Sequence, residues 1–268
     1  MSCKNTRFLI FLQKYFEMNK IVLITGATSG IGLGCARKFA ENGDRLILTG
    51  RNVQRLEEIK KELEAKDTKV LTLAFDVRDR EKAAECINNL PNEWKDIDVL
   101  VNNAGLALGL EPEYKGDFDD WETMIDTNIK GLLTMTRLIV PGMMERNRGH
   151  IINVGSVAGD AAYANGNVYC ATKSAVKTLS DGLRLDVADS NIRVTNLKPG
   201  LVETNFSNVR FHGDTERAAK VYKGIEPLTG DDIADVAVYA SNAPEHVQIA
   251  EVLILATYQG SGSVIVRK

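Results

Sequence analysis

Residues 20–32, KIVLITGATSGIG, decide the fold of this chain. Their first part, Lys20–Thr25, is a short apolar run of the kind that forms a buried strand. A glycine-rich loop follows, and Ile31–Asn42 then has the pattern of a helix that ends at Gly43. Such a loop can bring backbone amides close to a phosphate at the positive end of the helix dipole. The order of strand, loop and helix therefore predicts a nucleotide-binding unit rather than a plain turn.

Strands and helices alternate along the rest of the chain. Strands are predicted at 45–49, 70–75, 97–101, 149–154, 192–197 and 251–255, and helices at 53–66, 80–90, 118–146 and 167–187. This alternation predicts a parallel sheet with right-handed crossovers and helices on both faces. The predicted fold class is α/β, a Rossmann-like doubly wound parallel sheet of about seven strands. Residues 18–268 are expected to form it as a single domain, with ligands bound beyond the carboxyl ends of the strands.

The composition argues against several classes of partner. The chain has 268 residues and a formal net charge of −3, so no basic field attracts nucleic acid or anionic lipid. No apolar run reaches the ~20 residues that a membrane span needs. The four cysteines show neither C-x-x-C spacing nor a histidine at the spacing of metal ligands, which argues against a disulfide or a metal site. We predict a cytoplasmic protein with no metal, nucleic-acid or membrane partner.

The first residues resemble a signal peptide only in part. Lys4 and Arg7 precede an apolar run at 8–12, which is shorter than the roughly 7–15 apolar residues that a signal peptide needs. Met18 stands just before the first predicted strand. Residues 1–17 are therefore expected to be a dispensable N-terminal extension.

The glycine loop has the spacing T-G-x-x-x-G-x-G, and on this basis the chain resembles the short-chain dehydrogenase/reductase family. The resemblance extends over residues 20–258 and implies a nicotinamide-dependent oxidoreductase. The cofactor loop would consist of Gly26, Thr28, Ser29, Gly30, Ile31 and Gly32. Three later segments, each directly after a predicted strand, would also line the cofactor. These are Asp76-Val77, Asn102-Asn103-Ala104-Gly105 and the segment that contains Pro199, Gly200, Val202 and Thr204.

The end of the second predicted strand indicates which dinucleotide binds. NAD-binding folds place an acidic residue there for the ribose hydroxyls. This chain has Thr49-Gly50-Arg51-Asn52 instead, with no carboxylate. The guanidinium of Arg51 would attract a 2′-phosphate that a carboxylate would repel. We therefore predict NADP(H), with Arg51 and Asn52 in its site. A solvated arginine at the start of a helix is the alternative.

Four residues are predicted to carry the reaction. Tyr169 and Lys173 stand at i and i+4 on one face of a predicted helix, where the ammonium would lower the pKa of the phenol. A Tyr-x-x-x-Lys match alone could arise by chance, but Ser156 follows a strand and lies 13 residues before Tyr169. Its hydroxyl could hold the substrate oxygen beside the phenol. The family resemblance adds Asn128, which could otherwise be a core asparagine, and it places Lys173 on the nicotinamide ribose.

Several segments resemble one subgroup, the NADP-dependent 3-hydroxy acid (serine/L-allo-threonine) dehydrogenases. They are NNAGLALG at 102–109, WETMIDTN at 121–128, GNVY at 166–169 and FSNVRF at 206–211. The resemblance implies a homotetramer or dimer that interconverts a small 3-hydroxy acid, of the serine, allo-threonine or 3-hydroxypropionate type, and its 3-oxo form. Because a carboxylate substrate should meet a cation, Arg210 joins Ser156 and Tyr169 as a predicted substrate residue. The alternative for Arg210 is an ordinary surface arginine.

Two other functions compete with this one. A general ketoreductase or a 3-oxoacyl-carrier-protein reductase would share the fold, and the latter would need a basic docking patch near the site. Segment 201–223 mixes basic and acidic residues and shows no clear patch. A non-catalytic NADP-binding sensor could lose its acid/base residues without losing its fold, so the presence of all four argues against a sensor.

Overall fold

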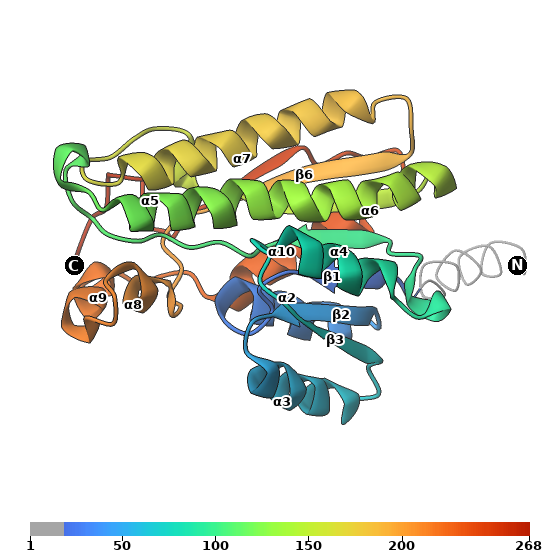
Figure 1. Ribbon diagram of the computed structural model, residues 1–268. Helices are drawn as coiled ribbons and strands as arrows, with labels where there is room; N and C mark the ends of the chain where they lie inside the picture. The colour runs from blue at the N-terminus through green and yellow to red at the C-terminus, as the bar shows by residue number, and fades with distance from the viewer. Residues whose placement is uncertain (1–18) are drawn as a thin grey trace, which may run out of the picture.

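The computed structural model describes residues 19–268, and its centre is a seven-stranded parallel sheet (Figure 1). The strands are β1 (Ile21–Ile24), β2 (Arg45–Gly50), β3 (Val70–Ala74), β4 (Val99–Asn102), β5 (Gly149–Val154), β6 (Ile192–Pro199) and β7 (Glu251–Ile254). They lie in the order β3-β2-β1-β4-β5-β6-β7, so the direction of winding reverses between β1 and β4. This confirms the predicted fold class. The prediction about residues 1–17 lies outside the described residues.

Helices cover both faces of the sheet (Figure 1). One face carries α4 (Arg80–Asn88), α5 (Phe118–Ile125), α6 (Leu132–Arg146) and α7 (Asn167–Asp186). The other face carries α2 (Gly30–Glu41), α3 (Val53–Glu64) and α10 (Gly230–Asn242). None of the helices among residues 19–268 is long and apolar enough to cross a membrane.

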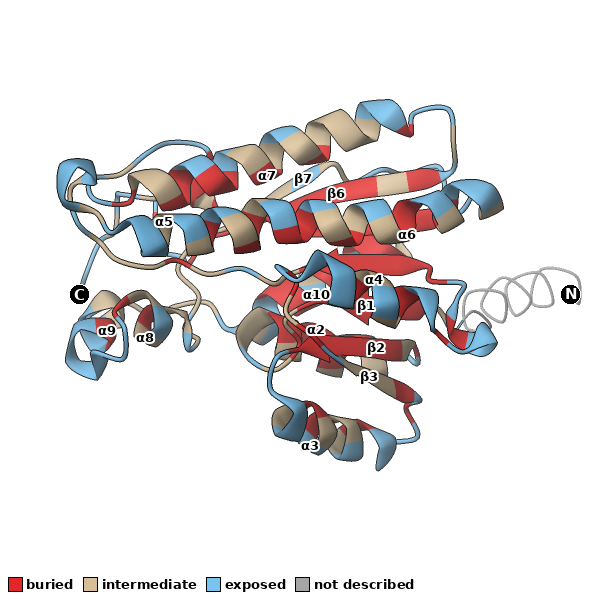
Figure 2. Ribbon diagram, in the orientation of Figure 1, coloured by how far each residue is buried: buried red, intermediate tan, exposed pale blue. Residues whose placement is uncertain are grey.

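Successive side chains of β1 belong to two different hydrophobic cores, one on each face of the sheet. Val22 and Ile24 pack with α2, α3 and α10, whereas Ile21 and Leu23 pack with α4 and α6. Successive side chains of a strand point to opposite faces, and here both faces are covered, so all four residues are buried. Figure 2 shows the same result for the whole sheet, since its central strands are buried while the outward faces of the helices are exposed.

The long helical region predicted at 118–146 is interrupted. A π-helical stretch, Asp126–Gly131, separates α5 from α6. Single π-helical turns of this kind often occur at functional sites, because they re-aim the side chains of a helix. Asn128, one of the predicted active-site residues, lies in this stretch.

No helix was predicted between the sixth and seventh strands, yet the structure has three there. They are α8 (Phe206–Arg210), α9 (Thr215–Tyr222) and α10. Figure 1 shows α8 and α9 beyond the ends of the strands, with the C-terminus of the chain beside them. The sequence does contain a signal for α10, because Thr229 and Asp232 form a capping box in which each side chain accepts the other's backbone N–H.

Candidate active site

A cavity of about 540 Å³ opens at the carboxyl ends of the strands. Its lining comes from the segments after β1, β2, β3, β4, β5 and β6, together with α7, α8 and the C-terminal residues. This is the place where a doubly wound sheet binds its ligands, next to the reversal between β1 and β4. The cavity therefore brings together residues that are far apart in the sequence.

The glycine loop shapes one end of the cavity. Gly30 has φ +52°, which favours glycine, and it begins the helix α2. A Cβ on Gly32 would lie 2.3 Å from the carbonyl oxygen of Gly26, so only glycine allows the loop to fold back this closely. The Ser29 side chain makes no hydrogen bond with the first turn of α2. The helix start is therefore not capped by Ser29, and Ser29, Gly30 and Ile31 line the cavity at the end of a helix where a pyrophosphate can bind.

The next part of the cavity wall carries charge. Arg51 lies at the end of β2, with a side chain that is 68% exposed, and its Nη1 stands 3.8 Å from Oδ2 of Asp76. Burial opposes the ionisation of Asp76, but hydrogen bonds and charge from Arg78, aided by Arg51, outweigh that effect and lower its pKa. A planar guanidinium at this point suits a phosphate on the ribose of a dinucleotide.

Most of the predicted cofactor residues line the cavity, but three do not. Gly32 lies behind the loop, as described above. Asn52 caps α3, since its side-chain oxygen accepts the N–H of Arg55. The Asn102 amide donates to Oδ1 of Asn153 at 2.9 Å, which ties β4 to β5. The positions of these residues indicate that they support the walls of the cavity.

The centre of the cavity holds the predicted reacting groups. Ser156, Tyr169 and Lys173 all line it, and they are 9%, 8% and 7% exposed, respectively. The Ser156 oxygen accepts the N–H of Ala158, and Nζ of Lys173 donates to the carbonyl oxygen of Val154 at 2.8 Å. The second contact joins α7, which carries Tyr169 and Lys173, to the end of β5, which Ser156 follows.

The pKa expected of Tyr169 from its neighbour is wrong for this structure. Burial raises the pKa of Tyr169 above its ordinary value, with a further increase from Tyr163, and a hydrogen bond with Ser156 opposes the change only in part. Nζ of Lys173 stands 5.9 Å from the Tyr169 ring centroid. Burial instead lowers the pKa of Lys173 to about 8. The spacing i, i+4 therefore aligns the two groups without a direct bond between them.

Asn128 lies just behind the cavity and is 2% exposed. Its side-chain oxygen accepts the N–H of Leu106 at 2.9 Å, and its amide donates to the carbonyl oxygen of Leu106 and to Oγ1 of Thr172. Because these bonds join the segment after β4 to α7, Asn128 connects two walls of the site. Its contacts are thus more specific than those of an ordinary core asparagine.

Arg210, at the end of α8, also lines the cavity. Its Nη1 donates to the hydroxyl of Tyr163 at 3.0 Å, and its Nε donates to the carbonyl oxygen of Gly109 at 3.2 Å. Its Cζ atom is 5.6 Å from the ring centroids of both Tyr163 and Tyr169. Arg210 therefore lies in the same cavity as Tyr169, and its role as the partner of a substrate carboxylate stays a prediction.

Several cavity residues were not predicted from the sequence. They include Tyr163, Gln259, Gly262 and Ile265. The side-chain oxygen of Gln259 accepts the N–H of Leu201 at 2.8 Å, and this bond holds the C-terminal segment against the residues after β6. For Tyr163 the sequence offers one signal, the nearby pair Asn165-Gly166, which is typical of a turn. In the structure Asn165 has φ +66°. The C-terminal segment offers no such local signal.

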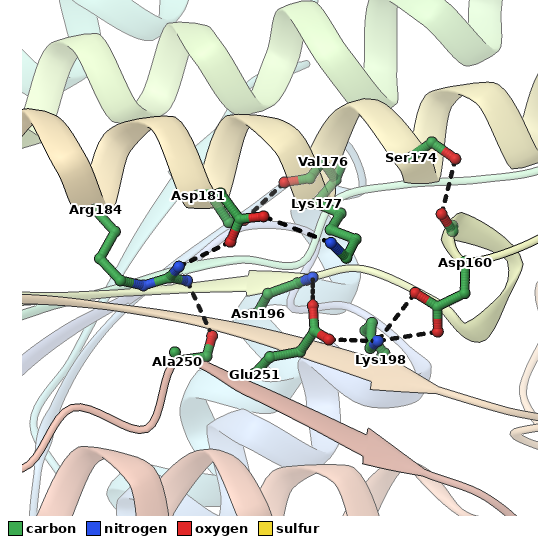
Figure 3. Close-up of polar contacts among 12 residues, drawn as sticks. Asp160, Ser174, Val176, Lys177, Asp181, Arg184, Asn196, Lys198, Ala250 and Glu251 are labelled. Carbon is green, nitrogen blue, oxygen red and sulfur yellow. Dashed lines mark hydrogen bonds and ion pairs between the residues drawn. The ribbon is translucent and has the colours of Figure 1, made fainter.

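A cluster of charged residues connects β6, β7 and the turn after β5 (Figure 3). Lys198, which is almost fully buried on β6, pairs with Asp160 at 2.9 Å and with Glu251 of β7 at 2.5 Å. Asp160 ends the short turn that begins at Ser156, and Lys198 directly precedes Pro199. The ion pair therefore links the Ser156 turn to the segment that lines the cofactor end of the cavity.

Comparisons with known proteins agree with this geometry. The family model described as short chain dehydrogenase matches residues 20–214. An NADP-dependent 3-hydroxy acid dehydrogenase of Salmonella typhimurium is 51% identical over 249 residues, which cover 92% of this chain and 99% of that relative. An NADP-dependent 3-hydroxy acid dehydrogenase of Schizosaccharomyces pombe is 47% identical over 251 residues, or 93% of this chain and 97% of that protein.

Solved structures show the same similarity. The closed form of a serine dehydrogenase complexed with NADP+ aligns with a TM-score of 0.87 and 48% identity, over 92% of this chain and 99% of that one. A serine dehydrogenase from Escherichia coli aligns with a TM-score of 0.75 and 45% identity, over 87% and 96% of the two chains.

Proposed function

Because the chain belongs to the short-chain dehydrogenase family, we propose that it is an NADP(H)-dependent oxidoreductase that interconverts a small 3-hydroxy acid and its 3-oxo form. One observation carries the proposal. Ser156, Tyr169 and the guanidinium of Arg210 face one cavity, which also reaches the glycine loop and Arg51. A hydroxyl donor, a proton exchanger and a carboxylate partner thus stand together at one end of a dinucleotide-sized space.

The residues of the cavity fit NADP(H). The amides at the start of α2 suit the pyrophosphate, Arg51 suits the 2′-phosphate, and Lys173 is within the part of the cavity where the nicotinamide ribose would lie. When bound, this cofactor accepts a hydride from the substrate carbon or returns one to it. The protein must then bind and orient the substrate and move its proton.

We assign the proton to the hydroxyl of Tyr169. In the oxidation the deprotonated Tyr169 oxygen takes the proton of the substrate hydroxyl, and in the reduction the neutral phenol gives its proton to the substrate oxygen. Ser156 donates to the substrate oxygen where negative charge develops. Lys173 would bind the nicotinamide ribose, and Asn128 fixes the wall of α7 that carries Lys173 through its bond with Thr172. The lowered pKa of Lys173 means that this ammonium is easily deprotonated as the proton leaves the site.

Arg210 is assigned to the carboxylate of the substrate. Its guanidinium is oriented by Tyr163 and Gly109, and it stands beside the Tyr169 ring. Two donor groups of an arginine can bind one carboxylate side by side, which favours hydroxy acids over neutral alcohols. A hydroxyl at C3 could then reach Tyr169 while the carboxylate stays on Arg210.

We also propose that the protein acts in the cytoplasm as a homotetramer or dimer. The support for self-association is a group of exposed apolar side chains along α5, the π-helical stretch and α6, namely Phe118, Ile125, Leu133 and Met144. Side chains of this kind on a helix face favour contact with another protein surface.

The proposal is tested by initial rates on a panel of substrates with NADP+ and, separately, with NAD+. We expect oxidation of serine, allo-threonine and 3-hydroxypropionate with NADP+, and much lower rates for neutral alcohols of similar size. Greater activity on an acyl-carrier thioester in the reductive direction would favour a 3-oxoacyl-carrier-protein reductase instead. A complete lack of turnover with tight NADPH binding would favour a sensor.

A further inference from the structure

An acidic residue lies in the wall of the cofactor cavity. Asp76 lines the same region as Arg51, and its Oδ2 stands 3.8 Å from Nη1 of Arg51. A carboxylate at this point would repel a 2′-phosphate, and it would also compete for the positive charge of Arg51. In a site that binds NADP(H), another cation therefore has to neutralise the negative charge of Asp76.

Arg78 makes dense contacts with that carboxylate. Its Nε lies 3.1 Å from both Oδ1 and Oδ2 of Asp76, its Nη2 lies 2.8 Å from Oδ2, and its backbone N–H donates to Oδ1 at 3.0 Å. Arg78 is not among the residues that line the cavity. Its guanidinium therefore holds the carboxylate from outside the cavity, while Arg51 approaches from the cavity side.

Two other polar residues near the end of β2, Asn52 and Arg55, are bound to other partners and not to Asp76. Asn52 is engaged as the cap of α3, through the N–H of Arg55. The guanidinium of Arg55 pairs with Glu58 at 2.9 Å. Arg51 itself is 68% exposed, so its charge is free to meet a ligand if Asp76 does not hold it.

We propose that Arg78 neutralises Asp76 and so reserves Arg51 for the 2′-phosphate, which makes Arg78 a determinant of selectivity for NADP(H) over NAD(H). Arg78 acts through Asp76 and not by touching the cofactor, so it is a positioning residue. The inference rests on the proposed use of NADP(H), and it assigns a role to a residue that the sequence alone did not single out.

The test is equilibrium binding of NADPH and NADH, measured by calorimetry on the full chain. We expect Arg78→Gln to weaken NADPH binding about tenfold and NADH binding less than about threefold, because only NADPH carries the phosphate that an unpaired Asp76 repels. Arg80→Gln, at an exposed arginine two residues further along, is the matched control and should change neither affinity.

A double variant separates this role from a direct contact. Adding Asp76→Asn to Arg78→Gln removes the carboxylate that needs neutralising, so NADPH binding should return to within about threefold of the Asp76→Asn single variant. If Arg78 contacted the phosphate itself, the second substitution would rescue nothing. If Arg78→Gln fails to fold, Arg78→Lys takes its place in the test. The lysine keeps the charge but loses the paired contacts with Asp76, so NADPH binding should weaken about threefold.

Two outcomes would overturn the inference. One is an equal loss of NADPH and NADH affinity in Arg78→Gln, and the other is a loss that Asp76→Asn does not rescue. Both differ from a failure of the proposed function, in which the unchanged protein would show no preference for NADPH at all.

Discussion

The floor and the rim of the cavity are built in different ways. The floor consists of Asn128, Ser156, Tyr169 and Lys173, which are all buried. Asn128 donates to Thr172 of α7 and Lys173 donates to the carbonyl oxygen of Val154 of β5, whereas Ser156 accepts an N–H of its own turn. The rim consists of Arg51 together with α8, α9 and the C-terminal segment, where more of the surface is exposed. Arg210, the last residue of α8, belongs to the rim, and its guanidinium donates to one hydroxyl and one carbonyl oxygen.

This difference separates chemistry from recognition. Reacting groups must hold their geometry closely, and buried contacts with the sheet provide that rigidity. Charged ends of the ligands must enter and leave, so the groups that bind them stand on segments with fewer contacts. We therefore expect floor substitutions to change the rate of the reaction and rim substitutions to change the affinity for a ligand.

The largest expected effect comes from Tyr169→Phe. Removal of this hydroxyl takes away the proton exchanger while the ring keeps its packing, so kcat should fall about 10³-fold. NADPH binding should stay within about threefold of the original, because the cofactor is held elsewhere in the cavity. Steady-state rates and calorimetry provide the two measurements. Tyr239→Phe, at an exposed tyrosine on α10, is the control. Full turnover by the Tyr169 variant would contradict the assignment of Tyr169 as the proton exchanger.

A smaller effect is expected from Arg210→Ala. Loss of the carboxylate partner should raise KM for 3-hydroxy acids about 30-fold, with a much smaller change for a neutral alcohol. The comparison variant is Arg217→Ala, because Arg217 also lies on the rim but pairs with Glu111 and does not line the cavity. Michaelis constants for one charged and one neutral substrate decide the matter. Equal increases for both would show that Arg210 only shapes the rim.

The smallest expected effect concerns stability and pH. Burial lowers the pKa of Lys173 from 10.5 to about 8, so the folded protein binds fewer protons than the unfolded chain between these two values. Stability should therefore rise with pH across this window, and the full cost of the buried ammonium should be present below pH 8. Lys173→Met should be inactive yet more stable by about 2 kcal/mol at neutral pH.

Urea unfolding at several pH values checks this prediction. The advantage of the methionine variant should shrink as the pH rises above about 8. Lys177→Met is the control, since Lys177 lies on the same helix but pairs with Asp181 near the surface. A constant advantage at all pH values would mean that charge burial is not its cause.

The sequence predicted the floor better than the rim, for a physical reason. Ser156 follows a predicted strand, and Tyr169 and Lys173 lie on a predicted helix, so local signals indicate their positions, whereas Asn128 was predicted only from the family resemblance. The predicted strand 149–154 and the observed β5 coincide, and Ser156 follows both. The π-helical stretch at Asn128 could not be predicted, because its extra hydrogen-bond spacing depends on packing against α7.

The rim depends on contacts between distant parts of the chain. Gln259 reaches the N–H of Leu201, 58 residues away, and no pattern near either residue indicates this. The pKa of Tyr169 was also mispredicted, because a neighbour on the helix is visible in a sequence whereas burial is not. Arg51 and Arg210 were predicted from their charge and their places after the second and sixth predicted strands, but the 68% exposure of the Arg51 side chain follows only from the structure.

The most direct test follows the transferred hydrogen itself. 3-Hydroxypropionate that carries deuterium at C3 is incubated with the protein and NADP+, and the reduced cofactor is examined by mass spectrometry and NMR. We predict that the deuterium appears on C4 of the nicotinamide ring and that the organic product is the 3-oxo acid. Formation of the product with deuterium released to water, or of unlabelled NADPH, would contradict hydride transfer in this cavity.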